Sequence, residues 1–129
     1  MSKEKITHYF NNIAWQWDSL NIHDPNKIRF ILNAAEVKEN SSVLDVACGT
    51  GVLLPFLLEK NVKRIDGIDI SENMIALARQ KQKDILQSQK QSIFSDLSCR
   101  RSISFQVADA YQYLPPAGVL YDTIIIYSA

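Results

Sequence analysis

The 129-residue sequence contains no apolar run that approaches the ~20 residues needed to span a bilayer. Its first ten residues, MSKEKITHYF, include lysines but no apolar stretch of the kind that a secretory signal requires. Only two cysteines are present, Cys48 and Cys99, so a disulfide scaffold is excluded and we expect both thiols to be free. These absences predict a cytoplasmic protein without a membrane anchor.

Net charge is absent as well. Fourteen Lys and Arg residues balance fourteen Asp and Glu residues, which argues against a nucleic-acid partner because such proteins usually carry a net positive charge. No group of His, Cys, Asp or Glu residues has the spacing of a metal site. We therefore expect a small-molecule ligand, no nucleic acid and no bound metal.

The apolar residues alternate between strand-like runs and helical spacing, which predicts a single α/β domain over residues 1–129 with a parallel sheet. Asp24 and Ser71 are the expected N-caps of two helices. The predicted strands are residues 42–46, 64–70, 103–107 and 121–127. The predicted helices are residues 25–37, residues 52–60 and a helix after Ser71 whose polar continuation, within residues 80–98, is solvated helix or loop. Residues 109–114 are a turn or a short helix.

The last predicted strand is almost continuously apolar over residues 123–127, which is typical of a strand covered on both faces in the middle of a parallel sheet. The given sequence ends two residues later. A strand without a further neighbour exposes an open edge that invites pairing. We therefore expect either that this is the first part of a larger domain or that copies of the chain associate through this edge.

The most informative stretch is VLDVACGTG, residues 43–51, in which a buried strand leads into a Gly-x-Gly turn and a helix. Glycines let main-chain N–H groups approach a nucleotide-like ligand closely. Asp45, inside this segment, would repel a pyrophosphate. A carboxylate here suits a ligand that carries an ammonium and a sulfonium, such as S-adenosylmethionine.

Four segments together resemble the class I S-adenosylmethionine-dependent methyltransferases, in the order that this family shows. They are VLDVACGTG at residues 43–51, GIDIS at residues 67–71, VADAYQYL at residues 107–114 and YDTIIIYSA at residues 121–129. The resemblance implies a Rossmann-like, doubly wound, mostly parallel sheet in three αβα layers. The family's sheet has seven strands, of which this chain would supply the first four.

The resemblance also implies a role for each motif residue. The two glycines of the turn, Gly49 and Gly51, would lie under the amino-acid part of the cofactor, whose carboxylate would meet N–H groups at the start of the next helix. Asp69 lies eighteen residues after Gly51, a spacing that suits a carboxylate accepting both ribose hydroxyls. The expected cofactor-binding residues are Asp45 for the ammonium, Ala47, Gly49, Gly51, Asp69, Ile70 and Met74 beside the adenine, and Asp109 with Ala110 at the adenine amino group.

Residues 1–23 include an aromatic stretch with Tyr9, Phe10, Trp15 and Trp17. It is either a lid over the cofactor, as in related methyltransferases, or aromatic packing onto the core. We expect His8 and His23 to be surface residues, and Cys48 to pack in the glycine turn rather than act as a nucleophile. No catalytic residue is identified.

The sequence thus predicts methyl transfer from S-adenosylmethionine to a small-molecule acceptor, with S-adenosylhomocysteine as product. Two alternatives stay open. One is a non-catalytic or incomplete cofactor-binding domain. The other is an NAD(P)-dependent oxidoreductase, against which stand Leu54 at the place of a third glycine and the unfavourable position of Asp45 for a diphosphate.

Overall fold

Four parallel strands form one sheet in the computed structural model, which describes residues 2–14, 23–90 and 101–127. The strands are β1 (Ser42–Val46), β2 (Arg64–Asp69), β3 (Ser102–Val107) and β4 (Thr123–Ile126). Their order is β3-β2-β1-β4, and all three pairings are parallel. The chain thus reverses its direction of travel across the sheet between β3 and β4, and such a switch point opens a crevice at the carboxyl ends of the strands.

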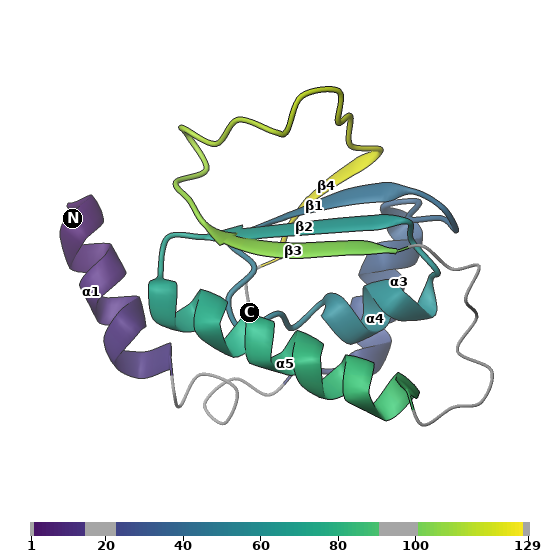
Figure 1. The fold of residues 1–129 in the computed structure, drawn as a ribbon, viewed down its shortest axis with the longest axis horizontal. Helices are drawn as coiled ribbons and strands as arrows, with labels where there is room; N and C mark the ends of the chain where they lie inside the picture. The colour runs from purple at the N-terminus through teal and green to yellow at the C-terminus, as the bar shows by residue number, and fades with distance from the viewer. Residues whose placement is uncertain (1, 15–22, 91–100, 128–129) are drawn as a thin grey trace.

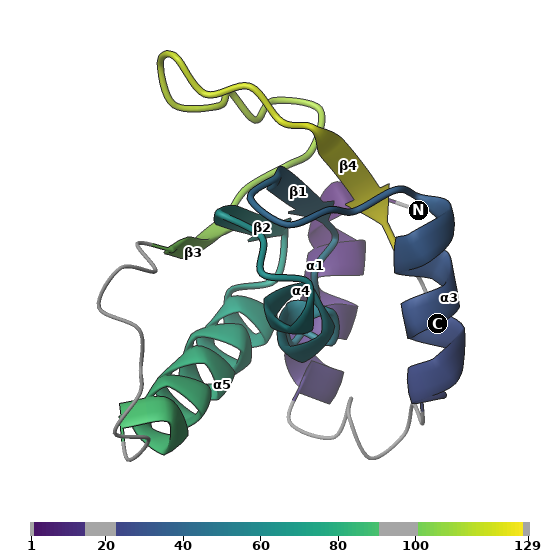
Figure 2. The same ribbon diagram turned by 90° about the vertical axis from the view of Figure 1, so that its right-hand side faces the viewer.

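Of the described helices, all but the first lie on one face of this sheet (Figures 1 and 2). The helices are α1 (Lys3–Ile13), α3 (Pro25–Ala34), α4 (Leu54–Glu59) and α5 (Glu72–Lys90). Residues 108–122 arch over the opposite face, and α1 stands beyond the carboxyl ends of the strands (Figure 1). The parallel, doubly wound sheet is confirmed, and the described residues supply two of the three expected layers.

Both predicted helix caps are confirmed. The Asp24 carboxylate accepts a hydrogen bond from the Asn26 N–H at 2.9 Å, and the Ser71 hydroxyl accepts one from the Met74 N–H at 3.2 Å. The helix after Asp24 ends at Ala34 rather than at residue 37, because Glu36 takes a positive φ of 58° that breaks the helix. Trp15, Trp17, Cys99 and the end of the polar segment, residues 91–98, lie outside the described residues.

β4 is shorter than predicted and is not covered on both faces by the described residues. It pairs only with β1, and of its isoleucines Ile125 is buried while Ile124 and Ile126 are 61% and 72% exposed. The edge of β4 away from β1 has no partner strand among the described residues. Association through this edge stays a prediction.

On the side of the sheet that the helices cover, the core is tightly packed around Gly67 in β2. A Cβ atom on Gly67 would lie 2.5 Å from Cδ1 of Phe105 on the neighbouring β3, and 3.1 Å from the Cys48 sulfur. Phe105 and Cys48 belong to the same buried cluster as Ile65 and Ile75. A glycine at this position therefore lets the Phe105 ring approach the main chain of β2 closely.

The opposite face of the sheet carries a buried carboxylate. Asp66 accepts hydrogen bonds from the Tyr121 hydroxyl at 2.5 Å, the Ser104 hydroxyl at 2.8 Å and the Arg64 Nε at 2.9 Å. Burial by itself raises the pKa of Asp66, but these three hydrogen bonds outweigh that effect and hold the pKa below its ordinary value. Tyr121 also contacts the Tyr113 hydroxyl at 3.0 Å, so Asp66 fastens residues 108–122 to the sheet.

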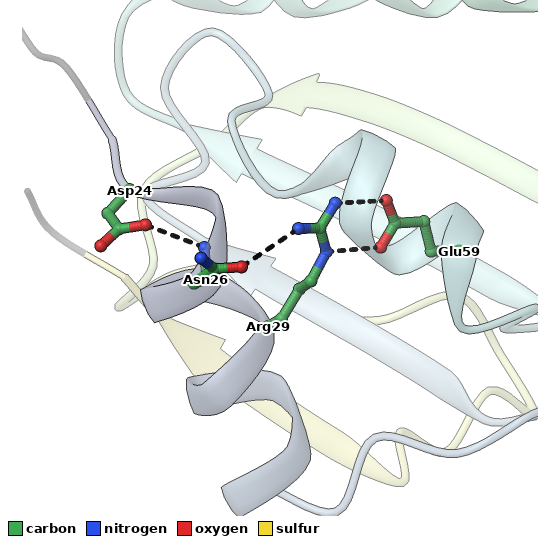
Figure 3. A network of polar contacts seen from close by, with 4 residues as sticks. All are labelled: Asp24, Asn26, Arg29 and Glu59. Atoms are coloured by element: carbon green, nitrogen blue, oxygen red, sulfur yellow. Dashed lines mark hydrogen bonds and ion pairs between the residues drawn. The ribbon is translucent and has the colours of Figure 1, made fainter.

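A surface network holds α3 against α4 (Figure 3). The Arg29 guanidinium donates two hydrogen bonds to the Glu59 carboxylate, at 3.1 and 3.0 Å, and lies 5.4 Å from the centre of the Phe56 ring. The paired geometry suits a guanidinium and a carboxylate better than a single contact. This network fixes the amino-terminal end of α3, where Asp24 caps the helix.

We predict that Gly67→Ala lowers the free energy of unfolding by about 1–3 kcal/mol, because the added methyl overlaps the Phe105 ring. Chemical denaturation monitored by circular dichroism measures the loss. Adding Phe105→Leu to Gly67→Ala should restore part of the stability. An unchanged stability of Gly67→Ala would contradict this account of the packing.

Candidate functional site

A cavity of about 480 Å³ lies at the carboxyl ends of the strands, a volume within the roughly 300–1,000 Å³ of small-molecule sites. The ends of β1, β2 and β3 contribute carboxylates to it, and α1 contributes the side chains of Ile6 and Phe10. Of the nine predicted cofactor-binding residues, eight line this cavity: Asp45, Ala47, Gly49, Asp69, Ile70, Met74, Asp109 and Ala110. The structure therefore brings together residues that span 66 positions of the chain.

Gly51 is the exception. It does not line the cavity, and a Cβ atom on it would lie 3.4 Å from the Ala78 Cβ of α5 and 3.7 Å from the Phe105 ring. Its φ of +82° is one that only glycine adopts without strain. This glycine serves the turn and the close packing of α5, and a cofactor contact at Gly51 stays a prediction.

Asp45 is the most buried carboxyl group of the site. It is 2% exposed, and no described residue donates a hydrogen bond to it. Burial, followed by the charge of Asp69, raises the pKa of Asp45 to about 8. The raised pKa favours the neutral form of Asp45. A positively charged ligand group in the cavity would instead stabilise its ionised form.

Asp69 joins the two turns that form the floor of the cavity. Its Oδ2 accepts a hydrogen bond from the Gly49 N–H at 2.8 Å, and its Oδ1 accepts one from the Ser71 N–H at 2.9 Å. Burial raises the pKa of Asp69 above its ordinary value despite these hydrogen bonds. Each carboxylate oxygen has a second lone pair, so Asp69 can accept from ligand hydroxyls while it holds both turns.

The amide groups of the glycine turn are largely taken up by the protein. The N–H of Cys48 donates to the Ile68 carbonyl at 3.0 Å, and that of Gly51 donates to the Cys48 carbonyl at 3.0 Å. The Gly49 N–H is bound to Asp69, as described above. The tight turn thus satisfies its own donors. The N–H groups that were expected to meet a ligand carboxylate are those at the start of the next helix, and that expectation stays a prediction.

Ala47 stands in the same turn with a positive φ of 56°. A non-glycine residue in this region is held by its surroundings against a local cost, and such residues gather at functional sites. Cys48 is a buried, free thiol whose pKa is raised by burial and then by the charges of Asp45 and Asp69. The prediction that Cys48 packs rather than reacts agrees with this environment.

Asp109, after β3, connects the site to α1. Its carboxylate accepts a hydrogen bond from the Tyr111 N–H at 3.0 Å and forms an ion pair with Lys3 at 3.2 Å. These two contacts hold the pKa of Asp109 below its ordinary value. Beside it, Ala110, Ile70 and the buried Met74 supply the apolar wall that was expected near an adenine.

The prediction that both histidines lie on the surface is right for His8, which is exposed, and wrong for His23. His23 lines the cavity, and its Nδ1 lies 3.1 Å from the Tyr127 hydroxyl. Its other ring nitrogen, Nε2, is buried and has no hydrogen-bond partner among the described residues. Sequence reasoning missed this pair because the two residues are 104 positions apart.

Other cavity residues without a sequence signal are apolar, such as Ile6 of α1 and Leu53. Within the described ranges, no group of three or more His, Cys, Asp or Glu residues could hold a metal ion. None of the helices described is long and apolar enough to cross a membrane.

A family model described as a methyltransferase domain matches residues 43–129, from the first strand of the sheet through the last. The chain belongs to the class I S-adenosylmethionine-dependent methyltransferases. The match begins at the strand that carries Asp45, so the family covers the glycine turn and all three carboxylates. This assignment favours the methyltransferase interpretation over an NAD(P)-dependent oxidoreductase.

Two curated relatives show the breadth of the family. Demethylmenaquinone methyltransferase of Oceanobacillus iheyensis is 30% identical over 90 residues, which are 64% of this chain and 38% of that protein. Ribosomal protein L11 methyltransferase of Ruminiclostridium cellulolyticum is 30% identical over 79 residues, which are 58% of this chain and 25% of that protein. The chain thus spans well under half the length of these relatives.

Among solved structures, magnesium protoporphyrin IX methyltransferase of Synechocystis PCC 6803 with bound S-adenosylhomocysteine superposes with a TM-score of 0.66. It is 22% identical, and the superposition covers 97% of this chain and 57% of that one. At this level of identity the match establishes the shared fold.

We predict that Asp45→Asn changes how stability depends on pH. The folded pKa of about 8 lies above the unfolded value, so between these pKa values the folded state binds one proton more. The stability of the native chain should therefore fall as pH rises from about 5 to about 8.5, by up to about 1.4 kcal/mol per pH unit. Asp45→Asn removes this loss.

Thermal unfolding at several pH values measures the effect, with the exposed Asp84→Asn as the matched control. Asp45→Asn should be more stable than the native chain at the alkaline end, and the two should converge at the acid end. Parallel curves for the native chain and Asp45→Asn would contradict the assignment.

Proposed function

We propose that this chain binds S-adenosylmethionine in the cavity and forms the cofactor-binding part of an enzyme that methylates a small molecule. The observation that carries the proposal is the placement of Asp45, Asp69 and Asp109 at the ends of three successive strands around one cavity. Three carboxylates and an apolar wall suit a cationic adenosine derivative and are unfavourable for a diphosphate.

The residues present fit this cofactor group by group. Asp45, buried and without a partner among the described residues, would accept the ligand's ammonium. Asp69 would accept the ribose hydroxyls, and Asp109 would accept the adenine amino group. Ile70 and Met74 would flank the adenine, and Ala47, Gly49 and Ala110 would bring the main chain close to the ligand.

When bound, S-adenosylmethionine supplies an electrophilic methyl group on a positively charged sulfur that is a good leaving group. The protein's part is then to orient the reactants and to exclude water, and holding two reactants in line is worth roughly 7–11 kcal/mol in favourable cases. With the cofactor bound, the apolar cavity wall and Phe10 of α1 would exclude water from the strand ends. No strong general base is required for acceptors that are nucleophilic by themselves.

A small-molecule acceptor is favoured by the balanced charge of the chain and by the quinone and porphyrin substrates that the names of several relatives state. A cytoplasmic location and association through the β4 edge belong to this proposal as well. The alternative of a non-catalytic cofactor-binding domain predicts cofactor binding without turnover. Transfer of labelled methyl from S-adenosylmethionine to molecules of a metabolite extract distinguishes the two.

The binding step is tested by isothermal titration calorimetry with S-adenosylhomocysteine, S-adenosylmethionine and NAD. We expect both adenosyl ligands to bind and NAD to bind weakly or not at all. Below the Asp45 pKa of about 8, binding should release a proton, so affinity should rise with pH by up to about tenfold per unit. Titrations in buffers of different ionisation enthalpy measure that proton.

Asp45→Asn should weaken S-adenosylhomocysteine by about ten- to a hundredfold, as expected for a lost hydrogen bond between charged groups, and should abolish the proton release. Asp84→Asn should behave like the native chain. Tighter binding of NAD than of S-adenosylhomocysteine would overturn the proposed function.

We further propose that α1 acts as the lid expected for residues 1–23. Its Asn11 accepts hydrogen bonds from the Ser71 hydroxyl at 2.5 Å and the Asn73 N–H at 3.3 Å, and Lys3 pairs with Asp109. Ile6 and Phe10 line the cavity between these two attachments, so α1 would move when a ligand enters or leaves.

Asn11→Ala should therefore speed the dissociation of S-adenosylhomocysteine by about three- to tenfold, the effect of losing a hydrogen bond that holds the lid. Stopped-flow fluorescence measures the rate. The exposed neighbour Asn12→Ala is the matched control. Equal dissociation rates in the two variants would show that this attachment does not limit release.

A further inference from the structure

The buried carboxylate of Asp66 does not line the cavity and has no part in the proposed chemistry. Burying a carboxylate is unfavourable unless hydrogen bonds offset the loss of water. Two of its three donors, Arg64 and Ser104, belong to the neighbouring positions of β2 and β3. The third, the Tyr121 hydroxyl, comes from the segment that arches over this face of the sheet (Figure 1). Asp66 therefore connects the arch to the middle of β2.

The hydrogen bonds that leave Asp66 have a fixed direction. The pKa of Asp66 is held below its ordinary value, so the group is ionised at neutral pH and can only accept. Tyr121 must then donate its one hydroxyl proton to Asp66. Its oxygen is left to accept from the Tyr113 hydroxyl, 3.0 Å away. Both tyrosines are half-buried, and together they carry the attachment from β2 to Tyr113.

Tyr113 directly follows the turn that carries Asp109. Within this turn the Gln112 N–H donates to the Asp109 carbonyl at 2.9 Å, and the Tyr111 N–H donates to the Asp109 carboxylate at 3.0 Å. Bonds of this kind fix an aspartate side chain relative to its own main chain. The direction in which the carboxylate faces the cavity therefore depends on what holds the turn.

The turn is held on both sides by β2. Before it, the Ala108 N–H donates to the Asp69 carbonyl at the end of β2, at 2.9 Å. After it, the Tyr113 hydroxyl leads through Tyr121 to Asp66. The chain that continues beyond Tyr113 adds little packing, because residues 114–118 are all exposed. The two tyrosine hydroxyls thus supply the attachment on the far side of the turn.

The ion pair between Asp109 and Lys3 cannot replace this attachment. Lys3 is exposed and belongs to α1, the helix proposed above to move when a ligand enters or leaves. An exposed ion pair also contributes little, about 0–1 kcal/mol. While α1 is displaced, the hydrogen bonds to β2 are the contacts that keep the Asp109 turn in place.

We propose that Tyr113 and Tyr121 are positioning residues, which keep the Asp109 carboxylate directed at the adenine amino group by connecting its turn to Asp66. This inference rests on the proposed cofactor and on the role proposed for Asp109. Neither tyrosine lines the cavity, so their hydroxyls would influence recognition of the base without touching the ligand.

The test compares S-adenosylhomocysteine with its analogue that lacks the exocyclic amino group of the base, by calorimetry on the full chain. In the native chain, loss of this amino group should weaken binding by about tenfold. Tyr113→Phe should weaken S-adenosylhomocysteine by about three- to tenfold and leave the affinity of the analogue unchanged. Tyr121→Phe should show the same pattern. A merely structural role would weaken both ligands alike.

Two further variants test the connection to Asp109. Tyr111→Phe is the matched control, since its ring is fully exposed and the substitution keeps the main-chain N–H that Asp109 accepts. It should behave like the native chain. In an Asp109→Ala background, Tyr113→Phe should cause no further loss of S-adenosylhomocysteine, because residues that act through one another are not additive.

Hydrogen exchange of the free chain provides a measurement without ligand. The amides of residues 109–113 should exchange faster in Tyr113→Phe than in the native chain or in Tyr111→Phe. Native-like binding of the analogue shows that a variant is folded, and Tyr121→Phe serves as the second variant should Tyr113→Phe not fold.

Equal losses for both ligands, or an unchanged preference for S-adenosylhomocysteine in both tyrosine variants, would overturn the positioning role and leave the proposed cofactor intact. Equal binding of the two ligands by the native chain would remove the contact between Asp109 and the base, and this inference with it. Failure of the native chain to bind either ligand would instead overturn the proposed function.

Discussion

The carboxylate of Asp69 is the contact on which the candidate site depends. It receives the Gly49 N–H from the turn after β1 and the Ser71 N–H from the turn after β2, so one side chain sets the spacing of both. Ser71 in turn caps α5 and binds Asn11 of α1. Two strand ends, one helix start and the helix over the cavity are therefore connected through a chain of short hydrogen bonds.

Burial gives the site its chemical character. Two neighbouring carboxyl groups, Asp45 and Asp69, lie in a largely apolar cavity, and burial raises the pKa of both. An arrangement of this kind disfavours its own ionised form until a cation arrives. A ligand ammonium would favour the ionised form of Asp45, so the affinity for such a ligand would depend on pH.

The two faces of the sheet support this site through different contacts. On the helix side, Gly67 lets Phe105 pack closely beneath the glycine turn. On the other face, Asp66 holds Tyr121 and thereby residues 108–122, at whose start Asp109 lies. Asp66 and Asp69 belong to the same strand, but Asp66 is hydrogen-bonded within the fold whereas Asp69 faces the ligand cavity. The reason is that side chains along β2 alternate between the two faces of the sheet, and only the end of the strand reaches the crevice.

The sequence by itself determined the elements and their order: the strand patterns, the caps at Asp24 and Ser71, and acids at three strand ends, all set by neighbours within a few residues. Eight of the nine residues that it predicted to bind the cofactor line the cavity. They do so because parallel strands end at one edge of the sheet, which brings the residues at their ends together. Only the tertiary structure decided that Gly51 packs against Ala78 instead of the cavity, that α1 covers the site, and that His23 meets Tyr127. Those outcomes depend on contacts between distant parts of the chain, and no local periodicity encodes which side chain a distant segment will face.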